Sequence, residues 1–137
     1  MPVDVETLCA DGVPAAYVIR GHGAPGETVF PTPADLNLQV GFVGRLRGET
    51  IDPHVHHDIE RHIVGTMEVL LVVEGRCELD IYDADRALVA TAGMAKGDIV
   101  LLVSGGHGIR VLDDTVLFEV KQGPYGGLHE KERFSPS

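Results

Sequence analysis

Two consecutive stretches decide the fold of this chain: Gly48-Glu-Thr-Ile-Asp-Pro-His54-Val-His56-His57-Asp-Ile-Glu60 and Gly65-Thr-Met-Glu68-Val-Leu-Leu-Val-Val-Glu-Gly75. His54 and His56 are two residues apart, so their imidazoles project from the same face of an extended segment. Glu68 begins the next apolar run. If the two stretches are neighbouring strands, two imidazoles and a carboxylate converge, and these are ligands that divalent transition metals prefer.

Length and composition limit the class of protein. The chain has 137 residues, a formal net charge of −10 and a sequence pI near 5.0. One domain is expected, and the acidic balance argues against nucleic acid or an anionic membrane as a partner. Cys9 and Cys77 form no metal or redox motif and are expected to be reduced. Neither a signal peptide nor a membrane span is recognisable, so a cytoplasmic protein is expected.

Strand signals follow one another at short, even spacing. Leu36–Leu46 alternates apolar and polar residues like a half-buried strand. Turn residues, among them Glu74-Gly75, Ala92-Gly93 and Gly105-Gly106, separate the later runs. These runs are Met67–Val73, Cys77–Tyr82, Ala87–Thr91, Ile99–Val103, His107–Leu112 and Thr115–Val120. Many short strands separated by turns predict an all-β sandwich or closed barrel.

The two ends of the chain give weaker signals. We expect residues 1–35 to form an irregular N-terminal arm, in which residues 4–10 could make one helical turn. The core then covers about residues 36–121, and residues 122–137 form a tail over the surface. The apolar run Ala15–Ile19 could add a strand to the sheet edge of a second copy, which predicts a homodimer.

Alternation assigns faces to the strands that bear the candidate ligands. Glu68 shares a face with Leu70 and Val72, and His107 shares one with Ile109 and Val111. Each candidate ligand therefore lies at a strand end on an apolar face, as at the mouth of an apolar barrel. The acidic residues Glu78, Asp80, Asp83 and Asp85 are expected on solvated faces.

With these residues in hand, the chain resembles the cupins, small jelly-roll barrels built as a double-stranded β-helix. Their first motif is Gly-x5-His-x-His-x3,4-Glu-x6-Gly. Gly48, His54, His56, Glu68 and Gly75 match it, with about seven residues inserted before the glutamate. The likeness covers about residues 40–121.

The second cupin motif, Gly-x5-Pro-x-Gly-x2-His-x3-Asn, is matched less completely. Gly97 and His107 resemble its ends at a spacing one residue short, and Val111 stands at the asparagine position. Cupins hold iron, manganese, nickel, copper or zinc with three histidines and a glutamate. The resemblance therefore implies that His54, His56, Glu68 and His107 hold one divalent transition metal.

Other residues near the motif have alternative interpretations. Glu60 fits the short motif spacing literally, but only Glu68 begins an apolar strand, so Glu68 is preferred as the ligand. His57 faces away from His54 and His56 in a regular strand. Glu60 and Arg61 could recognise a substrate or form a surface ion pair. His62 could lie over the site or be solvated, and His22 and His129 carry no spacing signal.

Three neutral imidazoles and one carboxylate leave open positions on an octahedral ion, at which a substrate oxygen or water can bind. This favours a metal-dependent enzyme for a small polar, sugar-like metabolite, acting by isomerisation or oxygenation. Glu60 and His62 are then candidates for the catalytic proton shuttle. A non-catalytic ligand-binding or sensor barrel, and a metal-free barrel with a histidine base, are the alternatives.

Overall fold

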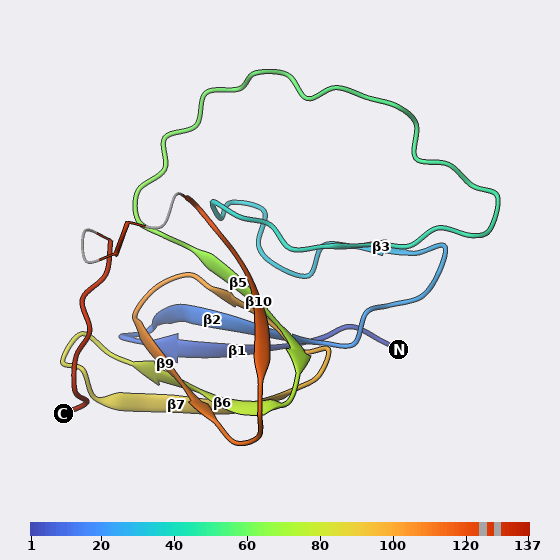
Figure 1. Cartoon of the computed structure of the whole chain (residues 1–137). Helices are drawn as coiled ribbons and strands as arrows, with labels where there is room; N and C mark the ends of the chain where they lie inside the picture. Colours follow the sequence, from blue (N-terminus) through green and yellow to red (C-terminus); the bar gives the residue numbers. More distant parts are fainter. Residues whose placement is uncertain (124–125, 128–129) are drawn as a thin grey trace.

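The sheets of this protein are antiparallel. A computed structural model covers the chain and describes residues 1–123, 126–127 and 130–137. Within these residues there is no α-helix, and the sheets do not close into a barrel. Two sheets face each other, and a short ribbon and a wide loop lie to one side of them (Figure 1). The predicted all-β class is confirmed, and within the described residues no helix could cross a membrane.

The larger sheet has five strands. Their order across the sheet is β1-β2-β8-β5-β10, so the N-terminal hairpin of β1 and β2 lies beside β8, and β10 lies beside β5. The strands are β1 (Asp4–Ala10), β2 (Val13–Arg20), β5 (Glu68–Glu74), β8 (Ile99–Leu102) and β10 (Val116–Lys121). Strand β10 lies at one edge, and its register with β5 places Lys121 opposite Glu68.

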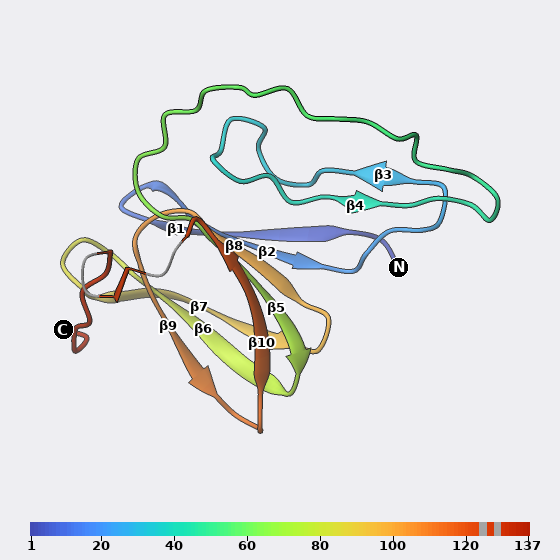
Figure 2. The same ribbon diagram turned by 45° about the horizontal axis from the view of Figure 1, so that its top comes forward.

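The second sheet has three strands in the order β7-β6-β9: β6 (Arg76–Tyr82), β7 (Leu88–Ala95) and β9 (Gly106–Val111). Strand β9 is an edge strand. The third group is a two-stranded ribbon of β3 (Thr28–Val29) and β4 (Phe42–Val43). Figure 2 shows this ribbon beside the larger sheet, on the side of the wide loop.

The hydrophobic core fills the space between the two large sheets. On β6, Cys77, Leu79 and Ile81 are at most 1% exposed. They pack in one cluster with Leu70 and Val72 of β5 and with residues of β1, β2, β7 and β8. The faces predicted for Leu70 and Val72 on β5 and for Cys77, Leu79 and Ile81 on β6 are therefore confirmed, whereas Val111, predicted on an apolar face of β9, is 60% exposed. Both cysteines are free, Cys9 exposed and Cys77 buried.

The N-terminal prediction was wrong for residues 4–20. The segment is no irregular arm and makes no helical turn, because β1 and β2 form a hairpin that completes the larger sheet. Asp11 and Gly12 both have positive φ, 53° and 77°, as the tightest hairpin turns require. Residues Ala15–Ile19 belong to β2, which pairs with β1 and β8, so they offer no free edge to a second copy. The homodimer itself stays a prediction.

Two further expectations were also wrong. Of the strand predicted at Leu36–Leu46, only Phe42–Val43 pairs, in the ribbon. The turn predicted at Ala92-Gly93 lies inside β7, where both residues pair with β6. The remaining predicted strands correspond to β5–β10 within a few residues. Between β4 and β5, residues 47–66 form a wide arc away from both sheets (Figures 1 and 2).

Candidate functional site

Glu68 and His107 meet at one end of the sandwich. Glu68 is the first residue of β5 in the larger sheet, and His107 is the second residue of β9 in the smaller one. The Nε2 atom of His107 lies 3.5 Å from the Oε1 atom of Glu68. Both side chains are partly exposed, 32% for His107 and 22% for Glu68. Two of the four predicted ligands, 39 positions apart in the sequence, therefore lie side by side.

The contact changes the acidity of Glu68. A hydrogen bond from His107 lowers the pKa of Glu68 from 4.5 to about 2, against the opposing effect of partial burial. The carboxylate is consequently charged at neutral pH, which is the state that binds a cation. An imidazole beside a charged carboxylate is a pairing that metal sites and general acid–base sites share.

A second carboxylate, which the sequence analysis did not select, lies next to this pair. Glu119 of β10 shares a hydrogen bond with Glu68, and this bond is the main cause of the raised pKa of Glu119. Leu117, Glu119 and Lys121 alternate along β10, and Lys121 is opposite Glu68. Applying the alternation rule to β10 would have placed Glu119 on the face that bears Glu68.

The other two predicted ligands are not at this contact. His54 and His56 lie in the arc of residues 47–66 and are exposed. Their rings contact edge to face, with centroids 5.3 Å apart, and Nδ1 of His54 lies 2.7 Å from the carbonyl oxygen of Asp52. Within the part of the chain that is described, no three His, Cys, Asp or Glu side chains are arranged to hold a metal ion. The structure thus brings together half of the predicted ligand set.

The candidate proton-shuttle residues are in the same arc. Glu60 and His62 are exposed, and so are His57 and Arg61. The arc ends where Asn37 Nδ2 donates to the carbonyl oxygen of Val64, at 3.5 Å. His22 lies in the loop after β2, and His129 lies outside the described residues.

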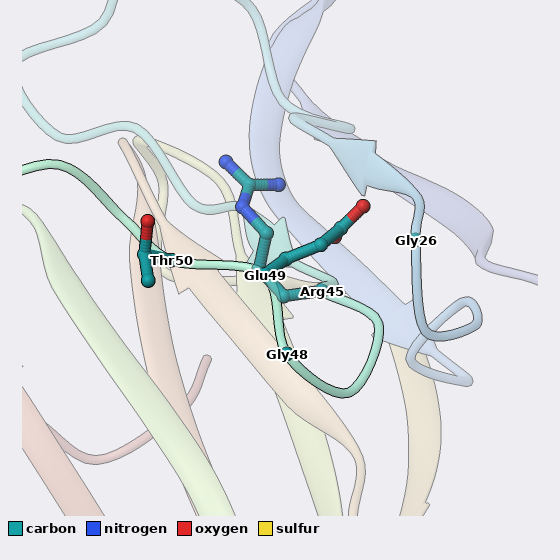
Figure 3. Close-up of a pocket in the computed structure, with 5 residues that line it drawn as sticks. All are labelled: Gly26, Arg45, Gly48, Glu49 and Thr50. Atoms are coloured by element: carbon teal, nitrogen blue, oxygen red, sulfur yellow. The ribbon is translucent and has the colours of Figure 1, made fainter.

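Two open hollows lie elsewhere, around Arg45. The first, of about 480 Å³, is lined by Gly26, Arg45, Gly48, Glu49 and Thr50 (Figure 3). The second, of about 360 Å³, lies between the loop after β2 and strand β4. Arg45 donates to the hydroxyl of Thr28 at 3.0 Å and to the carbonyl oxygen of Gly44 at 2.9 Å. The guanidinium therefore connects the two strands of the ribbon through hydrogen bonds. Neither hollow includes Glu68 or His107.

Asp80 departs from the expected solvated face. Its side chain is 4% exposed and accepts hydrogen bonds from Arg110 Nε at 2.7 Å, Arg110 Nη2 at 2.9 Å and the hydroxyl of Thr91 at 2.9 Å. The guanidinium is the main cause of the lowered pKa of Asp80. The expectation was wrong because the neighbouring strands supply a cation and a hydroxyl over this carboxylate.

Comparisons with known proteins found no matching family model, curated protein or solved structure.

Proposed function

We propose that this chain is a cupin-like metal-binding protein in which His54, His56, Glu68 and His107 hold one divalent transition metal. The contact between Glu68 and His107 carries the proposal. It joins the ends of strands from two different sheets, and the charged carboxylate and the imidazole are both partly exposed there. Such a pair supplies two ligands of the types that iron, manganese, nickel, copper and zinc accept.

The site requires residues 51–57 to leave the arc and add to the free edge of β9. Among the described residues, β9 pairs with β6 alone and has no strand on its other edge, and Val111 at its end is 60% exposed. An added strand would place two histidines of one face beside His107. Closing this side of the sandwich would also produce the jelly-roll barrel that the motif resemblance implies.

The same alternation extends the site. In an extended segment, Glu60 and His62 share the face of His54 and His56, so they would lie beyond the ligands on the same side of the added strand. A metal held by three imidazoles and a carboxylate supplies Lewis acidity at its open positions. We therefore propose an enzyme for a small polar metabolite, acting by isomerisation or oxygenation, with Glu60 and His62 as the groups that move a proton.

Metal titration of single variants tests the ligand set. Purified protein is freed of metal and titrated with Co²⁺ or Zn²⁺, and stoichiometry and affinity are measured. His54→Ala, His56→Ala, Glu68→Gln and His107→Ala should each weaken binding by at least about tenfold. His57→Ala and His22→Ala are the matched controls and should leave affinity unchanged.

Two outcomes would contradict the proposed site. If His107→Ala binds metal like the wild type while His54→Ala does not, the metal is held by the arc alone. If Glu60→Gln weakens binding and Glu68→Gln does not, Glu60 is the carboxylate ligand.

Oxygen consumption by the iron-loaded protein distinguishes an oxygenase, which consumes oxygen, from an isomerase, which does not.

A further inference from the structure

Strand β10 is an edge strand of the larger sheet and lies beside β5 (Figure 2). Among the described residues it pairs with β5 alone, so no strand lies on its other edge. An edge of this kind is a template on which another chain can add a strand. The side chains of β10 therefore decide whether the edge accepts a partner.

The side of β10 that faces away from the core is apolar. Leu117 packs against the core, so by alternation Val116, Phe118 and Val120 project from the opposite face. These three residues, the apolar stripe, are 51%, 57% and 45% exposed. The apolar surface continues onto β5, where the partly exposed Leu71 is opposite Phe118. No other edge strand of the described sheets carries three exposed large hydrophobic side chains.

The apolar stripe matches a second copy of itself. In an antiparallel pair with a twofold axis at Phe118, the two Phe118 residues are cross-strand neighbours, and Val116 of each copy is opposite Val120 of the other. Aromatic and β-branched pairs of this kind stabilise sheets. The two neighbouring twofold registers are worse, because one places Glu119 opposite Glu119 and the other places Val120 opposite Asp114.

The charges at the ends of β10 favour the same antiparallel orientation. The acidic turn Asp113-Asp114 precedes the strand, and Lys121 ends it. Antiparallel pairing brings the acidic turn of each copy to the lysine end of the other, whereas parallel pairing would bring the two acidic turns together. Lys121 also pairs with Glu130 of its own chain, so these charges set the orientation more than the affinity. The net charge of −10 on each chain opposes association, and the apolar stripe supplies the attraction.

We propose that β10 is a dimer interface, at which two copies of this chain pair edge to edge and join their larger sheets into one. The interface differs from the one expected at Ala15–Ile19, which lies inside the sheet. It uses the edge of the larger sheet, whereas the proposed metal site uses β9 of the smaller sheet. Each proposal can therefore fail without the other.

Sedimentation equilibrium of the metal-free protein tests the dimer. The wild type should sediment at twice the mass of one chain at micromolar concentration. Phe118→Asp places a charge at the twofold axis from each copy, and it should raise the dimer dissociation constant by at least about thirtyfold. Val89→Asp is the matched control, because it adds the same charge at a 46% exposed position on β7. It should leave the dissociation constant unchanged, and circular dichroism checks that both variants fold.

Cysteine crosslinking tests the register. In a Cys9→Ser background, the buried Cys77 is the remaining native thiol. Phe118→Cys should form an intermolecular disulfide under oxidising conditions, because the two residues are directly opposite. Val116→Cys alone should not, since the two copies of residue 116 lie at opposite ends of the paired strands. Val116→Cys combined with Val120→Cys should restore the crosslink.

Three results would overturn the proposal. The first is a wild type that stays monomeric at micromolar concentration. The second is a dimer that Val89→Asp weakens and Phe118→Asp does not, since another surface would then hold the two copies together. The third is efficient crosslinking through Val116→Cys alone, because the two β10 strands would then not be antiparallel about Phe118.

Discussion

Replacing Asp80 by alanine tests a buried carboxylate of the smaller sheet. Asp80 is 4% exposed and accepts three hydrogen bonds, two of them from one guanidinium. Hydrogen bonds to charged groups contribute about 1.5–3 kcal/mol each, but the partners here regain water when the carboxylate is removed. Arg110 is already 55% exposed, so we expect a net loss of about 2 kcal/mol, below the sum of the three bonds.

Urea unfolding followed by circular dichroism measures this loss. A change of about 2 kcal/mol should lower the urea midpoint by about 1 M in a protein of this size. Asp113→Ala is the control, since Asp113 forms a similar bond to Arg76 at 2.7 Å but is 52% exposed. Exposed pairs contribute little, so its midpoint should stay at the wild-type value. Equal midpoints for the two variants would refute the burial and pairing described for Asp80.

Three further outcomes follow from the same structure. The stability difference between the wild type and Asp80→Ala should shrink as the pH falls below 3.8, the ordinary pKa of the group, because a carboxylate with a lowered pKa stabilises the fold only while it is charged. Urea midpoints measured between pH 5 and pH 2 test this, and a constant difference would contradict the pairing. Gly75→Ala should lower the free energy of unfolding by about 2 kcal/mol, because φ is +93° and a Cβ would lie 2.2 Å from a backbone oxygen. Gly97→Ala has the same φ but open space around the Cβ, so thermal unfolding should show a loss of only about 1 kcal/mol. Leu79→Ala removes a core side chain and should lower the free energy of unfolding by about 2–5 kcal/mol, whereas Val89→Ala, at a position 46% exposed on β7, should lower it by less than about 0.5 kcal/mol. Similar urea midpoints for the two variants would contradict the assigned faces.

Strands β5 and β6 could be predicted because each has one buried face. On β6, Cys77, Leu79 and Ile81 alternate with polar residues, and the core selects that alternation. Leu36–Leu46 alternates as well, yet only Phe42 and Val43 pair. Alternation alone could not distinguish these cases, because pairing also needs a neighbouring strand with a matching free edge.

Two missed features had signals in the sequence. Asp11-Gly12 between apolar residues is a strong hairpin signal, and it forms the turn between β1 and β2. Asp80 and Arg110 both lie on strand faces away from the core, so their pairing could have been inferred once β6 and β9 were taken as neighbours. The order of the strands within each sheet could not be inferred by considering each strand separately.

For the candidate site, alternation correctly placed Glu68 and His107 on inward faces at strand ends. Their contact depends on the two sheets facing each other, and the structure supplies this arrangement. The positions of His54 and His56 relative to that pair do not follow from spacing, because residues 47–66 lie away from the sheets. Their joining the site remains a prediction.

Hydrogen exchange of residues 51–57, with and without one equivalent of Zn²⁺, tests this prediction most directly. These residues form no strand in the structure, so their amides should exchange rapidly when no metal is added. If the metal joins His54 and His56 to Glu68 and His107, pairing with β9 should slow that exchange in the wild type and not in His107→Ala. Fast exchange throughout residues 51–57 in the zinc-bound wild type would contradict the proposed site.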